Sequence, residues 1–254
     1  SSAPDAVWTD VELPDNWNRT KRWRGMDGAV WYRVDWTLPC AEHTSTAQTP
    51  WALRVDSVNM AGEVWVGDTL FWRDRQLSEP LSISWNVSRM WVLPQAVLAR
   101  HNTAWVRVVG VAVMSPGMGV VEVADANTVL QHQKTREWNS RTMQGINLVM
   151  SAALGLFFLA AWLWRREQTA NGWFAAASLC WVAFIFHSLM TETRPLHNVV
   201  VLSRLSLVAL LTYTACFVMF TWRFAGRRHP RQQRALGWGL AVMLVLVAVL
   251  PLRW

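Results

Sequence analysis

The sequence predicts an all-β sandwich followed by a bundle of four transmembrane helices. Three observations predict this fold class. Apolar and polar residues alternate with a period of two near the N-terminus, four long apolar runs follow residue 143, and arginine is concentrated in two of the loops between those runs. The first pattern is typical of strands with one buried face, and the other two are typical of membrane helices.

The clearest strand signal is the stretch GAVWYRVDWTLP, residues 28–39. Its apolar face carries Val30, Tyr32, Val34, Trp36 and Leu38. Further strands are expected at 51–58, 62–66, 103–113 and 119–125, and Gly67-Asp68 between two apolar runs predicts a hairpin. Several short strands without helical periodicity between them favour a sandwich. Twelve of the 19 tryptophans fall in residues 1–143, and we expect most of them in the core.

Residues 125–143 are polar and lack an apolar stripe. We interpret them as a linker, either a tether or a short helix, between the β-domain and the first membrane helix. This linker is the only covalent route between the two halves. A signal between them has to pass through it or through direct docking of the sandwich.

The four apolar runs are residues 145–164, 172–190, 199–222 and 235–252. Each is close to the ~20 residues that a helix needs to cross a bilayer. The loops 165–171 and 223–234 hold seven arginines, and tryptophans gather beside them. Positively charged loops stay in the cytoplasm, so the sequence predicts a cytoplasmic side for these loops and an extracytoplasmic side for residues 1–143.

The charge distribution argues against nucleic-acid binding. The net charge of +7 divides into −1 for residues 1–143 (14 Lys+Arg, 15 Asp+Glu) and +8 for the apolar half. The three cysteines and six histidines show no metal-ligand or redox spacing, and no nucleophile–base motif or phosphate loop occurs. We therefore expect no catalytic residue, no metal and no cofactor in this segment.

Four motifs of the first half occur in a characteristic order. They are LPDNW at 13–17, WYRVDWTLP at 31–39, LRVDSVNMAGEVWVGDTL at 53–70 and NTAWVRVVG at 102–110. This order resembles the sugar-binding jelly-roll domain of glycoside hydrolase family 2, with Gly67-Asp68 where that family usually has Asn-Gly. The resemblance implies a galactose-binding-like jelly roll over residues 1–124. The catalytic barrel of those hydrolases is not in this sequence, so glycosidase activity is not expected.

Two later segments extend the resemblance. The stretches SWNVSRMWVLPQAVL (84–98) and FTWRFAGRRHPRQQRALGW (220–238) resemble bacterial seven-transmembrane receptors with diverse intracellular signalling modules, with Ser88 in place of a proline. The resemblance implies an inner-membrane protein with a periplasmic jelly roll, a homodimer, three further helices and a histidine kinase or diguanylate cyclase output. Those last elements are not in this sequence.

A jelly roll can hold a sugar through aromatic rings that stack on it and polar groups that bind its hydroxyls. The ligand-binding candidates combine tryptophan with neighbouring Asp, Asn or Arg: Asp15, Trp17, Asn18, Trp72, Arg73, Asp74, Trp85, Asn86, Arg89 and Trp91. Core packing is the alternative for these tryptophans, because the sequence does not separate a buried tryptophan from an exposed one.

Four polar residues lie near the outer ends of the second and third apolar runs: His187, Glu192, Arg194 and Arg204. Charged groups at membrane depth are costly and are often functional. Arg204 can instead extend toward the interface or pair with Glu192. The functional hypothesis is that this group couples the outer domain to the helices.

Two functions stay open. The leading hypothesis is a sensory receptor whose outer domain binds a carbohydrate-like ligand or a partner protein and signals through the helices. The alternative is a non-catalytic accessory or scaffolding subunit of a membrane complex, in which the helices pack against partners. We expect the sequence after Trp254 to separate them, because a receptor requires further helices and a transmitter domain.

Overall fold

A computed structural model describes residues 8–20, 22–38, 50–191, 198–227 and 229–250. The chain divides into two compact units. The β unit lies mainly within Ser1–Ser140, and the helical unit comprises Arg141–Met190 and Arg194–Leu252. The structure therefore confirms a β-rich first half and a helical second half.

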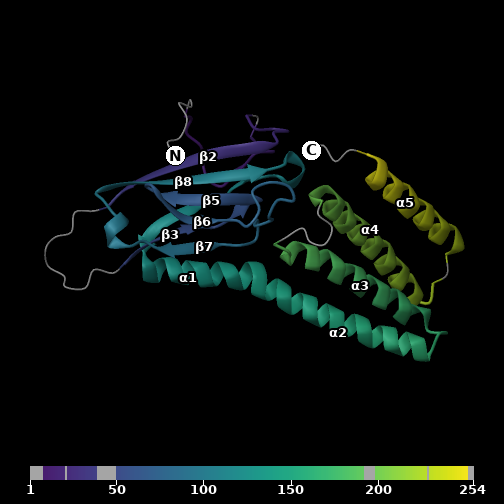
Figure 1. The fold of residues 1–254 in the computed structure, drawn as a ribbon. Helices are drawn as coiled ribbons and strands as arrows, with labels where there is room; N and C mark the ends of the chain where they lie inside the picture. Colours follow the sequence, from purple (N-terminus) through teal and green to yellow (C-terminus); the bar gives the residue numbers. More distant parts are fainter. Residues whose placement is uncertain (1–7, 21, 39–49, 192–197, 228, 251–254) are drawn as a thin grey trace. The chain divides into compact units, whose positions relative to one another are not determined.

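The described part of the β unit contains three antiparallel sheets, with strand orders β2-β8-β5-β6, β10-β3-β7 and β1-β9-β4. Figure 1 shows the four-stranded sheet above β3 and β7, with helix α1 below them. The strands are β1 Asp15–Asn16, β2 Gly28–Thr37, β3 Trp51–Val55, β4 Val58–Asn59, β5 Ala61–Val66, β6 Thr69–Arg73, β7 Arg89–Val92, β8 His101–Gly110, β9 Gly117–Met118 and β10 Val121–Asp125.

Strand β2 confirms the strand predicted from the period-two pattern. Val30 and Tyr32 are buried, whereas Arg33 and Asp35, which follow them in the strand, are exposed. The strand pairs with β8 over its whole length, from Gly28 opposite Gly110 to Thr37 opposite His101. In the sheet order β2 stands at one edge, so only one of its sides is paired within the described residues.

The predicted hairpin at Gly67-Asp68 is also confirmed. Strands β5 and β6 flank these two residues, and Val66 pairs with Thr69. Gly67 has a φ of 56°, in the left-handed region that a side chain disfavours and that such a two-residue hairpin requires. The turn residue therefore explains why the chain reverses here.

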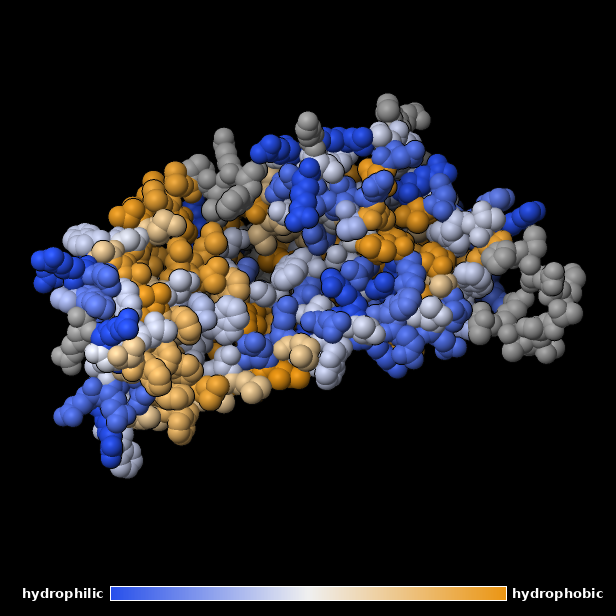
Figure 2. Space-filling model, turned by 180° about the vertical axis from the view of Figure 1, so that it is seen from behind, coloured by the Kyte–Doolittle hydropathy of each residue, from blue (hydrophilic) through white to orange (hydrophobic). Residues whose placement is uncertain are grey.

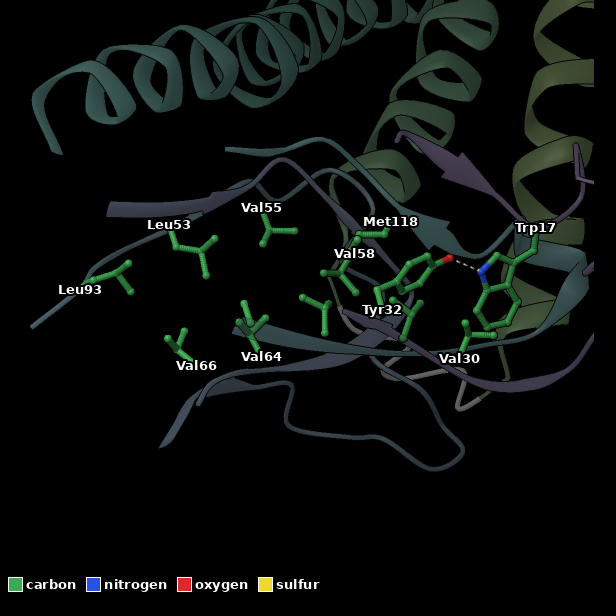
Figure 3. Packing of buried hydrophobic residues seen from close by; sticks show 13 residues of the cluster. Trp17, Val30, Tyr32, Leu53, Val55, Val58, Val64, Val66, Leu93 and Met118 are labelled. Atoms are coloured by element: carbon green, nitrogen blue, oxygen red, sulfur yellow. Dashed lines mark hydrogen bonds between the residues drawn. The ribbon is translucent and has the colours of Figure 1, made fainter. Parts of the chain in front are cut away.

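The core of the β unit is filled by valine, leucine and methionine from the facing sheets, together with Trp17 and Tyr32 (Figure 3). The expectation that most tryptophans are core residues is only partly met. Trp17 is the one described tryptophan that is fully buried, while Trp23, Trp36, Trp72 and Trp91 pack half-buried against the core's edge. A large indole rarely loses all its exposure, because one end reaches past the sheet.

The polar segment after β10, for which the sequence allows either a tether or a short helix, is helical. Helix α1 spans Ala126–Glu137, and the Asp125 side chain caps it by accepting from the backbone N–H groups of Asn127 and Thr128. Five residues of π-helix, Trp138–Thr142, connect α1 to α2. The hydrogen bonds of this π-helical turn therefore span one residue more than those of the α-helices around it.

The helical unit consists of α2 Met143–Trp164, α3 Thr169–Leu189, α4 Val199–Phe224 and α5 Pro230–Val249. Among the described residues, four helices are long and apolar enough to cross a membrane. Few of their side chains are buried within the chain, and several large apolar ones are exposed in the absence of lipid; Phe157 is 67% and Val249 73% exposed. Figure 2 shows apolar side chains, in orange, over much of this part of the surface. This exposure fits a protein whose helices are covered by a bilayer.

Candidate functional site

The β unit carries a groove along the free edge of β2. Two adjoining cavities of about 1020 and 780 Å³ form it, and both are lined by Asp10, Val11, Arg22, Trp23 and Met118. Seven consecutive residues of β2, residues 29–35, line the larger cavity, so the edge of the strand forms one wall. Residues 8–11 and 13 also line this cavity. We call this feature the β2 groove.

Aromatic side chains provide the apolar part of the β2 groove. Trp8, Trp23 and Trp31 line the larger cavity. Trp8 is 43% exposed and lies against Trp105 of β8, with ring centroids 5.4 Å apart. Trp23 is held against the core at its inner side. Flat rings fixed in this way can stack on a flat apolar face of a ligand.

Charged groups provide the polar part. On β2, the Nε of Arg33 lies 2.9 Å from a carboxylate oxygen of Asp35. The Thr103 hydroxyl donates to the other oxygen of Asp35 at 2.6 Å. Burial raises the pKa of Asp35, but the hydrogen bonds from Thr103 and Arg33 outweigh it, so the pKa lies below its usual value. Asp35 is therefore an ionised acceptor at neutral pH.

A second group of ion pairs lies beside Trp31 on this sheet. Glu63 of β5 is 3% exposed and accepts from Arg73 at 2.8 Å and from Arg107 at 3.3 Å. The Arg107 guanidinium carbon lies 5.8 Å from the centre of the Trp31 ring. Because Arg107 is held by Glu63, it supports Trp31 from the side of β8. The predicted candidate Arg73 belongs to this group.

The first cluster of predicted ligand-binding residues divides between the groove and the core. Asp15 lines the smaller cavity, yet it is 4% exposed and accepts from the Tyr32 hydroxyl at 2.7 Å. Trp17 is fully buried and its indole N–H donates to the Tyr32 oxygen at 2.8 Å. The Asn18 amide donates to the Ala112 carbonyl at 2.7 Å. Trp17 is therefore a core residue, as the alternative interpretation of these tryptophans expects, and its ring is not available to a ligand.

The second cluster brings four predicted residues together. The Arg89 guanidinium carbon lies 3.8 Å from the centre of the Trp72 ring, and Trp91 packs beside Trp72 at 6.3 Å. Asp74 accepts from the Gly62 backbone N–H at 3.0 Å and lies 3.5 Å from an Arg89 nitrogen. Burial raises the pKa of Asp74, although Arg89 opposes the shift. These groups bind one another, so the cluster joins β6 to the start of β7.

The remaining two candidates lie next to that cluster. Trp85 is 38% exposed and does not line the β2 groove. Asn86 is 9% exposed, and its amide donates to the backbone carbonyl of Ser140 at 2.8 Å. Asn86 therefore binds the π-helical turn instead of facing solvent.

The predicted coupling residues lie in the helical unit. Arg204 of α4 donates to the carbonyls of Ala248 at 2.8 Å and Leu250 at 3.3 Å. It thereby satisfies carbonyls at the C-terminal end of α5, which have no helical partner. His187 is half-buried in the last turn of α3. Glu192 and Arg194 lie outside the described residues.

Sequence reasoning missed the residues that form the groove: Trp8, Trp23, Trp31, Arg33 and Asp35. The polar face of the β2 pattern was visible in the sequence, but the position of β2 at a sheet edge was not. The arrangement offers stacking and hydrogen-bonding groups for a bound molecule. Within the described part of the chain, no three His, Cys, Asp or Glu side chains come together as a metal site.

Comparison with protein-family models finds no matching family, and comparison with curated proteins finds no match.

Proposed function

We propose that this chain is the sensing part of a membrane receptor, and that its β unit binds a carbohydrate-like ligand in the β2 groove. The observation that supports this most is the lining of the groove. Trp8, Trp23 and Trp31 offer ring faces, while Asp10, Arg22 and the Arg33–Asp35 pair offer donors and acceptors. A sugar ring presents apolar C–H faces and equatorial hydroxyls, so it needs both kinds of group at once.

The topology we propose follows from the arginine-rich loops. The connections after α2 and after α4 lie in the cytoplasm, and the β unit lies in the periplasm of a bacterial inner membrane. The jelly-roll resemblance supports the choice of ligand, and the receptor resemblance supports an output domain beyond this chain. Protease treatment of spheroplasts tests the topology. We expect cleavage in the β unit and protection of the loop after α4; the reverse pattern would overturn it.

Binding is tested on the full chain in nanodiscs by calorimetric titration with a panel of neutral and acidic oligosaccharides. The expected result is binding that Trp31→Ala weakens at least tenfold. Trp85→Ala is the matched control, because Trp85 is also a solvent-accessible tryptophan of the β unit but lies outside the groove. No binding across the panel, or equal losses in the two variants, would contradict a carbohydrate site in the groove.

An accessory or scaffolding subunit is the second candidate, and helix α5 favours it. The most apolar stretch of α5 contains no residue buried within the chain, so the faces of α5 that do not contact α4 are available to lateral partners. The intact mass of the protein from its native membrane separates the two functions. A mass well above 29.0 kDa favours the receptor. A mass near that value with stoichiometric partners favours the subunit.

A further inference from the structure

The segment Ser84–Arg89 connects two parts of the β unit that are distant in sequence. Its first and last residues belong to the cluster around Trp72, since an Arg89 nitrogen donates to the Ser84 hydroxyl at 2.9 Å. Its middle residues contact α1 and the π-helical turn through Asn86 and Ser88. We name this segment the clamp.

The contact with α1 is a reciprocal pair of hydrogen bonds. The Ser88 hydroxyl donates to the Gln133 side-chain oxygen at 2.7 Å, and the Gln133 amide donates back to the Ser88 carbonyl at 2.8 Å. Both residues are less than a tenth exposed. A buried pair with both partners satisfied fixes the rotation of α1, because any other register leaves these groups unpaired.

The second contact falls on the π-helical turn itself. The Asn86 amide donates to the Ser140 carbonyl at 2.8 Å, and both residues are buried. A π-helical turn holds one residue more than the α-helical turn that can replace it, and it needs outside contacts to persist. Asn86 supplies such a contact from another part of the chain.

We propose that the clamp holds Trp138–Thr142 in the π form, and that release of the clamp lets this turn become α-helical and changes the register of α2. This proposal rests on the proposed function, because the turn is the route by which a ligand bound to the β unit affects the membrane helices. When the extra residue of the π-helical turn is taken up into regular α-helix, α2 rotates by about 100° and shifts by about 1.5 Å relative to α1.

The other end of the clamp explains how the β unit controls it. Arg89 lies over Trp72 and near Asp74, which also accepts from the backbone N–H of Gly62 in β5. Movement of the four-stranded sheet that carries the β2 groove therefore moves Arg89, and with it Asn86 three residues away. The turn then has two states, π-helical and α-helical, and each is favoured by one position of the clamp. A ligand that binds one of these states more tightly shifts the population of molecules toward it.

The test measures the register of α2 directly. In the full chain with its three cysteines replaced by serine, single cysteines at positions 143–146 are labelled with a water-soluble maleimide in nanodiscs. Deletion of Asn139 removes the extra residue itself, so the turn becomes α-helical while the following helix keeps its register, which makes the deletion a second control. Asn86→Ala removes the contact with Ser140, and Trp85→Ala is the control in the same segment.

We expect the labelling pattern to move by one position in Asn86→Ala, and to stay unchanged in the Asn139 deletion and in Trp85→Ala. A pattern that Asn86→Ala leaves in place would overturn the proposal, as would equal shifts in Asn86→Ala and Trp85→Ala. If Asn86→Ala does not fold, Ser88→Ala makes the same test through the contact with Gln133. No ligand is present in these measurements, so their failure is distinct from failure of the oligosaccharide titration.

Discussion

The hydrogen-bonded chain Trp17–Tyr32–Asp15 gives the sharpest prediction for stability. The Tyr32 hydroxyl accepts from the Trp17 indole N–H at 2.8 Å (Figure 3). It donates to Asp15 at 2.7 Å. Tyr32→Phe removes this single oxygen. Trp17 at 0% and Asp15 at 4% exposure are then left without it, in a part of the core where little water can replace it.

The expected cost follows from the two broken bonds. Leaving a buried donor unpaired costs about 1–3 kcal/mol, and a bond to a carboxyl group adds a similar amount. Part of this cost is recovered, because the phenylalanine ring has no polar group that needs a partner. We therefore expect Tyr32→Phe to lower the free energy of unfolding of the β unit by about 2–4 kcal/mol. Burial and the bond to Asp15 both raise the pKa of Tyr32, so the hydroxyl stays a donor at every pH used.

The assay is urea unfolding of the full chain in detergent, followed by tryptophan fluorescence, which the β unit dominates through twelve of the 19 tryptophans. Tyr213→Phe in α4 is the control, and it should leave this transition unchanged. A loss below about 0.5 kcal/mol for Tyr32→Phe would refute the reasoning, because that is the size of an ordinary surface substitution.

Three further predictions concern other parts of the chain. Burial raises the pKa of Glu122, but the hydrogen bonds from His132 and Arg54 outweigh burial, so the pKa lies below its usual value of 4.5. The ionised carboxylate therefore stabilises the fold above pH 4.5, and this stabilisation is lost as the pH falls through the lowered pKa. Glu122→Gln should therefore flatten the fall of thermal stability below pH 4.5 measured by calorimetry, and a fall as steep as before would contradict this. Arg204→Met should speed amide exchange at the end of α5 about tenfold or more, while Arg204→Lys keeps a donor and should lie between; equal rates in all three would contradict the capping contact. A methyl group at Gly155 comes within 3.0 Å of the Ser178 side chain, whereas none of the described atoms lies within 4 Å of one at Gly145, so Gly155→Ala should destabilise the helical unit by about 1–3 kcal/mol and Gly145→Ala should not.

The elements with a strong local signal were predictable from the sequence. The alternation in residues 28–37, the turn at Gly67-Asp68 and the four apolar runs each depend on neighbours within one element. Their periodicity and turn chemistry are therefore visible without knowledge of the fold. The helix starts differ from the predicted runs by a few residues, because α3 and α5 begin at Thr169 and Pro230, ahead of the apolar part.

The candidate site was harder to predict, because it depends on which strand stands at the sheet edge. Arg33 and Asp35 form an ordinary polar face in the sequence, and only the strand order makes them a wall of the groove. Asn86 is a ligand-binding candidate in the sequence because it follows Trp85, and Ser88 is distinguished only by standing in place of a proline in the receptor resemblance. Their partners, Ser140 and Gln133, are about 50 residues away, and no short-range pattern connects them.

The edge of β2 that has no strand partner among the described residues also has a consequence for handling the protein. Backbone N–H and C=O groups along a ten-residue strand can pair with a strand of another molecule, which leads to aggregation. The exposed Arg33 and Asp35 discourage this, since a second copy would bring like charges close together in many registers. A molecule seated in the β2 groove covers the same edge. Solubility at high concentration should therefore rise when the groove is filled, and the least soluble preparation should be the one in which Arg33 and Asp35 are both neutralised.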